Sequence, residues 1–95
     1  MSAYMIAQID VTDLEEFKKY AALAGAVTEK FGGKYLARGG ATEALENYET
    51  GDRVVIIEFP DLVTARAWYE SDDYQSARKI REDAAVGKFL IVEGT

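Results

Sequence analysis

Residues 53–59, with the sequence RVVIIEF, form the stretch that decides the fold of this chain. β-Branched side chains dominate it and the chain's single proline, Pro60, follows directly, so it is predicted to be a β-strand that ends there. Alternate residues of a strand point to opposite faces of its sheet. Both faces of this strand are apolar, one with Val55, Ile57 and Phe59 and the other with Val54 and Ile56. The sheet that contains it therefore needs cover on both sides.

The segments on either side of this strand predict a βαββαβ order of elements. Strand-like segments alternate with helical periodicities, and glycine pairs at 32–33 and 39–40 mark turns. Ser71 is a favoured helix cap inside the second helical stretch, so we expect that helix to kink or restart there. The looser segment 41–50 is a candidate to extend the second strand as far as a turn at Gly51-Asp52. The predicted elements are a strand at 3–11, a helix at 13–31, strands at 34–38 and 53–59, a helical stretch at 62–84 and a last strand at 88–93.

This order predicts an α+β protein of the ferredoxin-like kind, with a single domain over residues 1–95. Its four-stranded antiparallel sheet should carry two helices on one face. The face toward the helices is predicted to hold Ala3, Met5, Ala7 and Ile9 of the first strand, Val55, Ile57 and Phe59 of the third, and Leu90 and Val92 of the last. All of these side chains are apolar, as the interior of a domain requires.

The opposite face of the sheet is too apolar to stay in water. Its predicted members are Tyr4, Ile6, Gln8, Val54, Ile56, Glu58, Phe89, Ile91 and Glu93. Two helices cannot cover both faces, so the sequence favours a homodimer in which two copies pack sheet against sheet around a barrel-like centre. The alternative is that the C-terminal tail or segment 41–50 folds over this face.

Composition excludes several classes of function. The 95 residues include no Cys and no His, which rules out Ser-His-Asp triads, thiolate nucleophiles and Cys/His metal sites, and no cofactor or metal is expected. With 11 Lys and Arg against 17 Asp and Glu, the net charge of −6 repels nucleic acids and anionic membranes. Because no segment has the pattern of a signal peptide or a membrane span, we expect a cytoplasmic protein.

Several blocks of the sequence resemble a bacterial family, domain-of-unknown-function family 1330. They are GGKYLARGG (32–40), RVVIIEFP (53–60), ARAWYESDDYQSAR (65–78) and IVEG (91–94). The resemblance implies the dimeric α+β barrel superfamily, whose members include cofactor-independent monooxygenases, isomerases and haem-degrading enzymes, so it implies a fold and a dimer but no reaction. Many members of the family have His where this chain has Phe31. Haem-type chemistry, which relies on an axial His, is therefore not expected.

Three charged residues are candidates for a ligand site. Arg38 ends a predicted strand before Gly39-Gly40, where its guanidinium and free backbone N–H groups suit a carboxylate or enolate. Glu58 is a candidate acid or base, and an Arg38–Glu58 ion pair on the dimer-facing sheet is the simpler explanation of both residues. Arg81 follows Tyr74 by one heptad, so both are predicted to point the same way, although a solvated Arg81 is equally consistent with its charged neighbours.

Aromatic residues gather around the predicted helix break. Trp68, Tyr69 and Tyr74 combine apolar bodies with polar tips, which is typical of pocket lining, but their spacing also fits core packing. We expect Arg38, Glu58, Tyr69 and Tyr74 to converge on a cavity of a few hundred Å³, as a ligand site needs.

Three functions remain open on the sequence. The first is a homodimer that binds a small aromatic or carboxylate molecule between its sheet and helices. The second is a dimerisation or assembly module without catalysis. The third is an enzyme resembling the cofactor-independent monooxygenases or isomerases, in which a Tyr or Glu58 handles a proton and Arg38 or Arg81 steadies an oxyanion.

Overall fold

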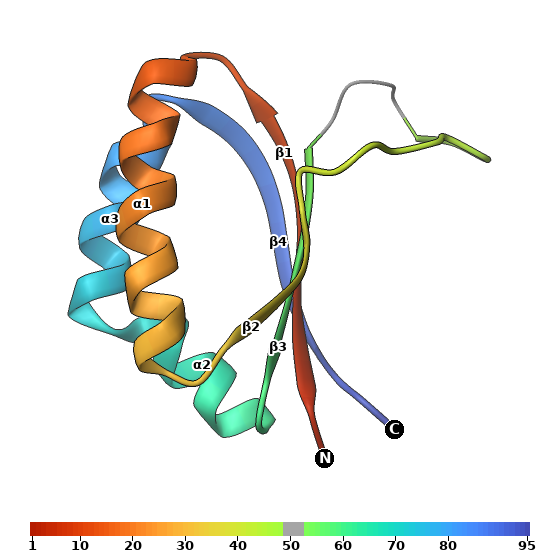
Figure 1. The fold of residues 1–95 in the computed structure, drawn as a ribbon, viewed down its shortest axis with the longest axis vertical. Coiled ribbons are helices and arrows are strands. Elements are labelled where there is room, and N and C mark those ends of the chain that lie inside the picture. The colour runs from red at the N-terminus through yellow and green to blue at the C-terminus, as the bar shows by residue number, and fades with distance from the viewer. Residues whose placement is uncertain (49–52) are drawn as a thin grey trace.

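Four strands and three helices make up the computed structural model, which describes residues 1–48 and 53–95. The elements are β1 (Ala3–Val11), α1 (Leu14–Lys30), β2 (Lys34–Arg38), β3 (Arg53–Phe59), α2 (Leu62–Glu70), α3 (Asp72–Glu82) and β4 (Ala85–Glu93). The strands form one antiparallel sheet in the order β2-β3-β1-β4. Figure 1 shows the helices on one side of this sheet and none on the other. The ferredoxin-like α+β prediction is confirmed.

The prediction of two helices is wrong, because the second helical stretch contains two separate helices. Ser71 lies between them with extended backbone angles (φ −63°, ψ 148°). Its hydroxyl donates to the carbonyl of Trp68 (2.7 Å) and accepts from the backbone N–H of Tyr74 (3.1 Å). One side chain therefore ends α2 and starts α3, as the expected restart at Ser71 requires.

The other two helix starts also have side-chain caps. Asp13 accepts a hydrogen bond from the backbone N–H of Glu16 at the start of α1, and Asp61 accepts one from Thr64 at the start of α2. Such caps satisfy backbone donors that have no partner within the helix. The first turn of α1 also contains Glu15 and Glu16, whose negative charges suit the positive end of the helix dipole.

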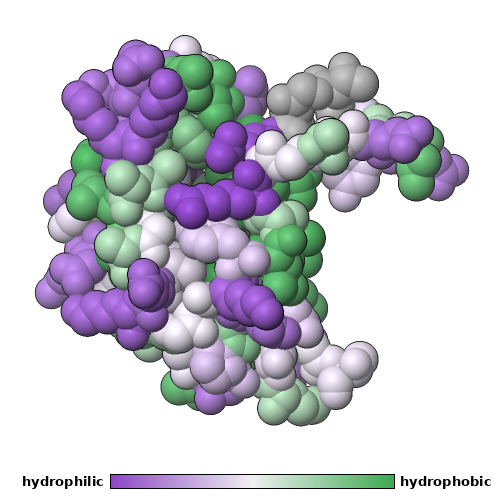
Figure 2. All heavy atoms as spheres, viewed as in Figure 1, coloured by the Kyte–Doolittle hydropathy of each residue, from purple (hydrophilic) through white to green (hydrophobic). Residues whose placement is uncertain are grey.

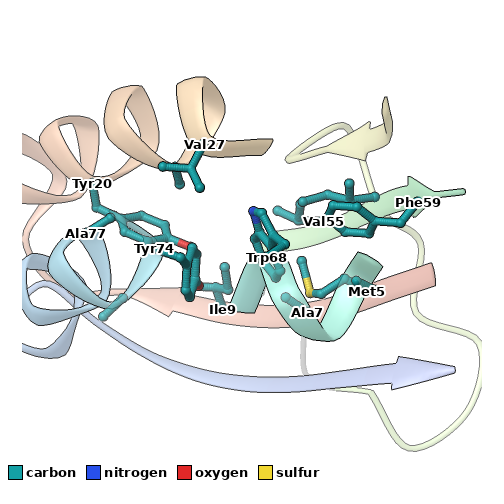
Figure 3. Packing of buried hydrophobic residues seen from close by; sticks show 14 of the residues in the cluster. Met5, Ala7, Ile9, Tyr20, Val27, Val55, Phe59, Trp68, Tyr74 and Ala77 are labelled. Carbon is teal, nitrogen blue, oxygen red and sulfur yellow. The ribbon is translucent and has the colours of Figure 1, made fainter. Parts of the chain in front are cut away.

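The core lies between the helices and one face of the sheet, and Trp68 occupies its middle. Its ring centroid lies 4.3 Å from that of Tyr74 and 5.2 Å from that of Phe59. Its indole N–H donates to the hydroxyl of Thr28 on α1 (3.2 Å). Figure 3 shows this indole between α1 and the sheet, with Tyr20 and Tyr74 further along the helix layer. These contacts tie α1, α2 and β3 into one interior.

The prediction for the two faces of β4 is wrong by one residue. Pairing with β1 places Ile91 opposite Met5 and Phe89 opposite Ala7, so Phe89 and Ile91 face the helices. Leu90 and Val92 instead lie on the other face, with 54% and 44% of their surface exposed. Both sets of side chains are apolar, so alternation within β4 could not distinguish the faces, whereas the register with β1 does. The strand also begins at Ala85 and not at 88.

We call the side of the sheet away from the helices the open face. Opposed residues share a face, so its members are Tyr4, Ile6, Gln8, Asp10, Lys34, Ala37, Val54, Ile56, Glu58, Val86, Lys88, Leu90 and Val92. Ile6, Val86, Leu90 and Val92 are its exposed large apolar side chains. Figure 2 shows hydrophobic surface, in green, on this side of the molecule. The open face therefore has the apolar character that the sequence predicted, with a corrected contribution from β4.

Residues 40–48, which we call the arm, leave the sheet after β2. The expected extension of strand pairing through 41–50 is absent from its described part, 41–48, and the turn predicted at Gly51-Asp52 lies outside the described residues. Every residue of the arm is exposed, and Figure 1 shows it projecting on the side away from the helices. At the other end of the chain, the Gly94 N–H donates to the Ser2 carbonyl (2.7 Å), beyond the end of the sheet. Neither segment forms the cover over the open face that was the alternative to a dimer.

No helix within residues 1–48 and 53–95 is both long enough and apolar enough to cross a membrane.

Candidate functional site

A small pocket lies between the helix-facing side of the sheet and α1. Its enclosed volume is about 30 Å³, which is room for a water molecule or two. The expected cavity of a few hundred Å³ is therefore wrong in size. Its aromatic and cationic lining comes from Phe17, Tyr20, Tyr35, Trp68, Phe89, Arg38 and Arg53, and the rest of its wall is aliphatic.

Arg38 reaches this pocket because β2 contains a bulge. The register shifts between Tyr35 and Ala37, so that Tyr35 pairs with Ile57 and Arg38 with Val55, both on the helix-facing side. The guanidinium lies 4.2 Å from the centre of the Tyr35 ring and donates to the carbonyl of Ala21 on α1 (3.1 Å). A regular strand would have placed Arg38 on the open face with Lys34.

Glu58 lies on the opposite side of the sheet from Arg38. It pairs with Tyr4 of β1 and Lys34 of β2, on the open face. The expected Arg38–Glu58 ion pair is therefore wrong, and so is the convergence of Glu58 with the aromatic candidates. The bulge in β2 is the reason, because it moves Arg38 to the face that Glu58 does not share.

Sequence reasoning did not propose the aromatic pocket residues Phe17, Tyr35 and Phe89, nor the charged one, Arg53. Arg53 shares the parity of Val55 and Ile57 on β3, and this signal was available in the sequence. Its guanidinium lies 5.4 Å from the centre of the Phe17 ring. A Cβ on Gly39 would lie 2.5 Å from the guanidinium carbon, so glycine at this position, where φ is +72°, leaves room for Arg53.

The aromatic candidates are brought together as predicted, but only Trp68 lines the pocket. The Tyr69 ring lies 5.3 Å from Tyr74 and 6.3 Å from Trp68. The Tyr74 hydroxyl contacts the Tyr20 hydroxyl at 2.9 Å in the buried interior, and Tyr20 does line the pocket. Tyr74 therefore reaches the pocket through Tyr20.

Burial controls the chemistry of this tyrosine pair. It raises the pKa of Tyr20 far above its ordinary value, and the neighbouring Tyr74 raises that pKa further. Burial also raises the pKa of Tyr74. An ordinary tyrosine is already protonated at neutral pH, and the raised pKa values keep both phenols protonated at alkaline pH as well. They can donate hydrogen bonds, but they are poor bases.

Arg81 is buried and lies behind the pocket wall. Only 8% of its surface is exposed, and its Nε has no hydrogen-bond partner. Its guanidinium lies 4.0 Å from the centre of the Phe89 ring and 5.6 Å from that of Tyr20. The solvated arginine considered from the sequence is thus replaced by a cation packed on two rings. Both rings line the pocket, so Arg81 influences it indirectly.

Four of the eleven Lys and Arg residues form ion pairs among the described residues, and the two pocket arginines are not among these four. Ion pairs within residues 1–48 and 53–95 join lysines 18, 19 and 30 and Arg78 to carboxylates. In those ranges neither Arg38 nor Arg53 has a carboxylate within 4 Å, and no cluster of three acidic residues could hold a metal ion. Within those ranges the site thus combines an apolar, aromatic wall with two arginines that have no carboxylate partner, an arrangement suited to an anion with an apolar body.

Comparisons with known proteins support the fold and leave the chemistry open. The family model described as "Domain of unknown function (DUF1330)" matches residues 2–95. No curated protein matches the chain.

Solved structures with the same fold have low sequence identity. A protein of unknown function from Rhodopseudomonas palustris is 19% identical, with a TM-score of 0.79 over 99% of this chain and 82% of its own. A dimeric ferredoxin-like protein of unknown function from Jannaschia sp. CCS1 is 11% identical, with a TM-score of 0.76 over 99% of this chain and 100% of its own. SnoaB, a cofactor-independent oxygenase from Streptomyces nogalater, is 12% identical, with a TM-score of 0.69 over 99% and 93%.

Proposed function

The chain belongs to the DUF1330 family, and from its own residues we propose that it is a homodimer in which each protomer binds a small organic molecule between its sheet and α1. The observation that carries the ligand proposal is the pocket wall of aromatic side chains with two arginines that have no carboxylate partner in the described ranges. The candidate site residues are Arg38, Trp68, Tyr69, Tyr74 and Arg81, together with Arg53 and Tyr20. Glu58 is assigned to the dimer contact instead.

The open face supports the homodimer. A row of exposed apolar side chains across a sheet favours self-association, and a twofold dimer would cover the face of each copy with that of the other. The arm adds further apolar surface, since Leu45 is 86% exposed and Tyr48 is 63% exposed. Its tip helps enclose a surface concavity of about 480 Å³ with Gln8 and Lys88 of the sheet. We therefore place the arm against the partner protomer.

Sedimentation velocity tests the dimer. The protein should sediment as a particle of twice 10.5 kDa, and Leu90→Lys should shift it toward the monomer because it introduces a charge among the exposed apolar side chains of the open face. Val63→Lys is the matched control, since Val63 is 77% exposed on α2, away from the open face. A monomer at micromolar concentration, or equal effects of the two variants, would contradict the proposal.

Trp68 reports on the pocket, because it is the single tryptophan of the chain and forms part of the wall. Benzoate, phenol and phenylacetate are suitable probes, and at least one should change its fluorescence in a saturable way. Ala21→Leu adds bulk to the pocket wall at a half-buried position and should weaken that response. The ligand proposal fails if none of the three probes gives a saturable signal.

The small volume of the pocket favours a second candidate, a dimerisation module that binds no ligand. An enclosed space of about 30 Å³ is what an ordinary core contains between imperfectly packed side chains. On this view Arg38 and Arg53 only cover the edge of the core with their aliphatic stems. The fluorescence experiment separates the two candidates.

In the oxygenase- or isomerase-like alternative, the position of Glu58 and the pKa of Tyr20 limit which residues could transfer a proton. Glu58 lies on the open face, away from the pocket, so it cannot exchange a proton with a ligand there. The raised pKa of Tyr20 disfavours its use as a base at neutral pH and leaves it as a hydrogen-bond donor. Arg38 and Arg53 are then the groups that would stabilise a developing oxyanion.

A further inference from the structure

We propose that Arg38 and Arg53 act together as a clamp for one carboxylate, so that the ligand of the pocket is a small aromatic carboxylic acid. This inference rests on the proposed function, because it assumes that the pocket takes a ligand, and it adds the chemical class of that ligand. It also assigns to Arg53 a binding role equal to that of Arg38.

The register of the sheet places the starting points of the two arginine side chains close together. Arg38 on β2 is opposite Val55 on β3, and Arg53 is two residues before Val55 on the same face. Such diagonal neighbours on adjacent antiparallel strands have backbones roughly 7–8 Å apart. Two long side chains that start this close together on one side of a sheet can reach the same anion, and both line the same pocket.

The charges of this pair are not neutralised within residues 1–48 and 53–95. Arg38 has one hydrogen bond, to a neutral carbonyl, and Arg53 lies against the ring of Phe17. Two like charges that share a partly apolar site repel each other, and a bound anion removes that repulsion. The carboxylate is favoured because a guanidinium offers it two parallel N–H donors.

The body of the ligand follows from the groups beside the clamp. The Phe17 and Tyr35 rings lie beneath the guanidinium groups, and Trp68 closes the pocket behind them. A planar aromatic ring has the shape to stack on such a wall. A tetrahedral phosphate dianion is a poorer fit, because its stronger hydration would have to be removed against apolar side chains.

The pocket volume of about 30 Å³ is smaller than the proposed ligand, so the two arginines must move when the ligand binds. Each guanidinium lies over a ring that lines the pocket, so in this position it occupies space at the mouth. Arg38 is exposed and Arg53 is half-buried, and both side chains have several rotatable bonds. When they turn toward a carboxylate they uncover the rings beneath. The charged groups thus open the pocket for the ligand that they bind.

Binding of benzoate and its neutral isostere benzamide, measured through Trp68 fluorescence, tests the clamp. Benzoate should bind at least about tenfold more tightly than benzamide. Arg38→Met and Arg53→Met keep an apolar stem of similar length but remove the charge, and each should weaken benzoate binding by about 10- to 100-fold and reduce the preference for benzoate over benzamide. Arg66→Met is the matched control, because Arg66 is exposed on α2 and does not line the pocket.

The outcomes separate this inference from the proposed function. Equal binding of benzoate and benzamide to the unmodified protein would overturn the clamp and leave the pocket as a ligand site. An effect of Arg38→Met without one of Arg53→Met would overturn the shared role, and tighter binding of phenyl phosphate than of benzoate would overturn the carboxylate assignment. Absence of a saturable signal with benzoate, phenol and phenylacetate would overturn the proposed function itself. If Arg53→Met fails to fold, Arg53→Lys keeps the charge without the planar fork and should still weaken benzoate binding.

Discussion

The buried contact between the Tyr20 and Tyr74 hydroxyls allows a quantitative test of the interior. Their oxygen atoms are 2.9 Å apart, and only 6% and 0% of the two residues is exposed. Tyr74→Phe therefore leaves the Tyr20 hydroxyl buried without this partner. An unsatisfied buried group costs about 1–3 kcal/mol of unfolding free energy, whereas removing both partners costs little. Tyr20→Phe should have a similar cost for the same reason.

A double-mutant cycle measures this coupling. Each single variant should lose about 1–3 kcal/mol of unfolding free energy, and the double variant Tyr20→Phe, Tyr74→Phe should lose clearly less than the sum of the two. Urea unfolding followed by Trp68 fluorescence gives these values, at one fixed protein concentration because dimerisation would add to stability. Strict additivity would show that the two hydroxyls are not coupled, and the account of the buried pair would then be wrong.

Three further predictions follow from single contacts. Gly33→Ala should lower the unfolding free energy by about 1–3 kcal/mol, because a Cβ at this position would lie 2.6 Å from a methyl group of Thr28. Gly40→Ala should leave the unfolding free energy unchanged, because no atom lies within 4 Å of the added Cβ. Urea unfolding of both variants tests this prediction. Hydrogen bonds from Thr64 lower the pKa of Asp61 in the folded protein. The ionised carboxylate therefore contributes to the unfolding free energy above about pH 4, and this contribution is lost as the pH falls through the folded-state pKa. In Asp61→Asn the unfolding free energy should depend less on pH in that range. The pKa values of Tyr20 and Tyr74 are raised in the folded protein, so their effect on stability has the opposite pH dependence. The protonated pair contributes fully to the unfolding free energy below about pH 10, and this contribution declines as the pH rises further. Above pH 10 the unfolding free energy should therefore fall less steeply for the double variant Tyr20→Phe, Tyr74→Phe than for the unmodified protein.

The sequence located the aromatic part of the candidate site but not its geometry. Trp68, Tyr69 and Tyr74 lie together because they occur within a few residues of one another at the helix break. Local spacing of this kind can be read from one segment. Whether a side chain reaches a pocket depends on packing against other elements, so Tyr20 contributes to the wall and Tyr74 does not.

The charged part of the site was less predictable, because it depends on strand register. The sequence predicts Arg38 and Glu58 on the same face of the sheet. In the structure a single extra residue in β2 moves Arg38 to the opposite face. Arg53 has the same parity as Val55, so its face of the sheet is predictable from the sequence, whereas its place in the pocket depends on packing against α1. A bulge leaves no clear sign in a five-residue strand, so the sequence could not reveal it.

The sequence by itself determined the order of strands and helices, the helix break at Ser71 and the apolar character of both sheet faces, because each depends on residues close together in the chain. The tertiary structure decided which side of β4 faces the helices, which face holds Arg38, and how little space the core encloses. These properties depend on how strands pair and how side chains from different elements fill a common volume. A strand that is apolar at every position does not indicate its pairing register or how its side chains pack against other elements.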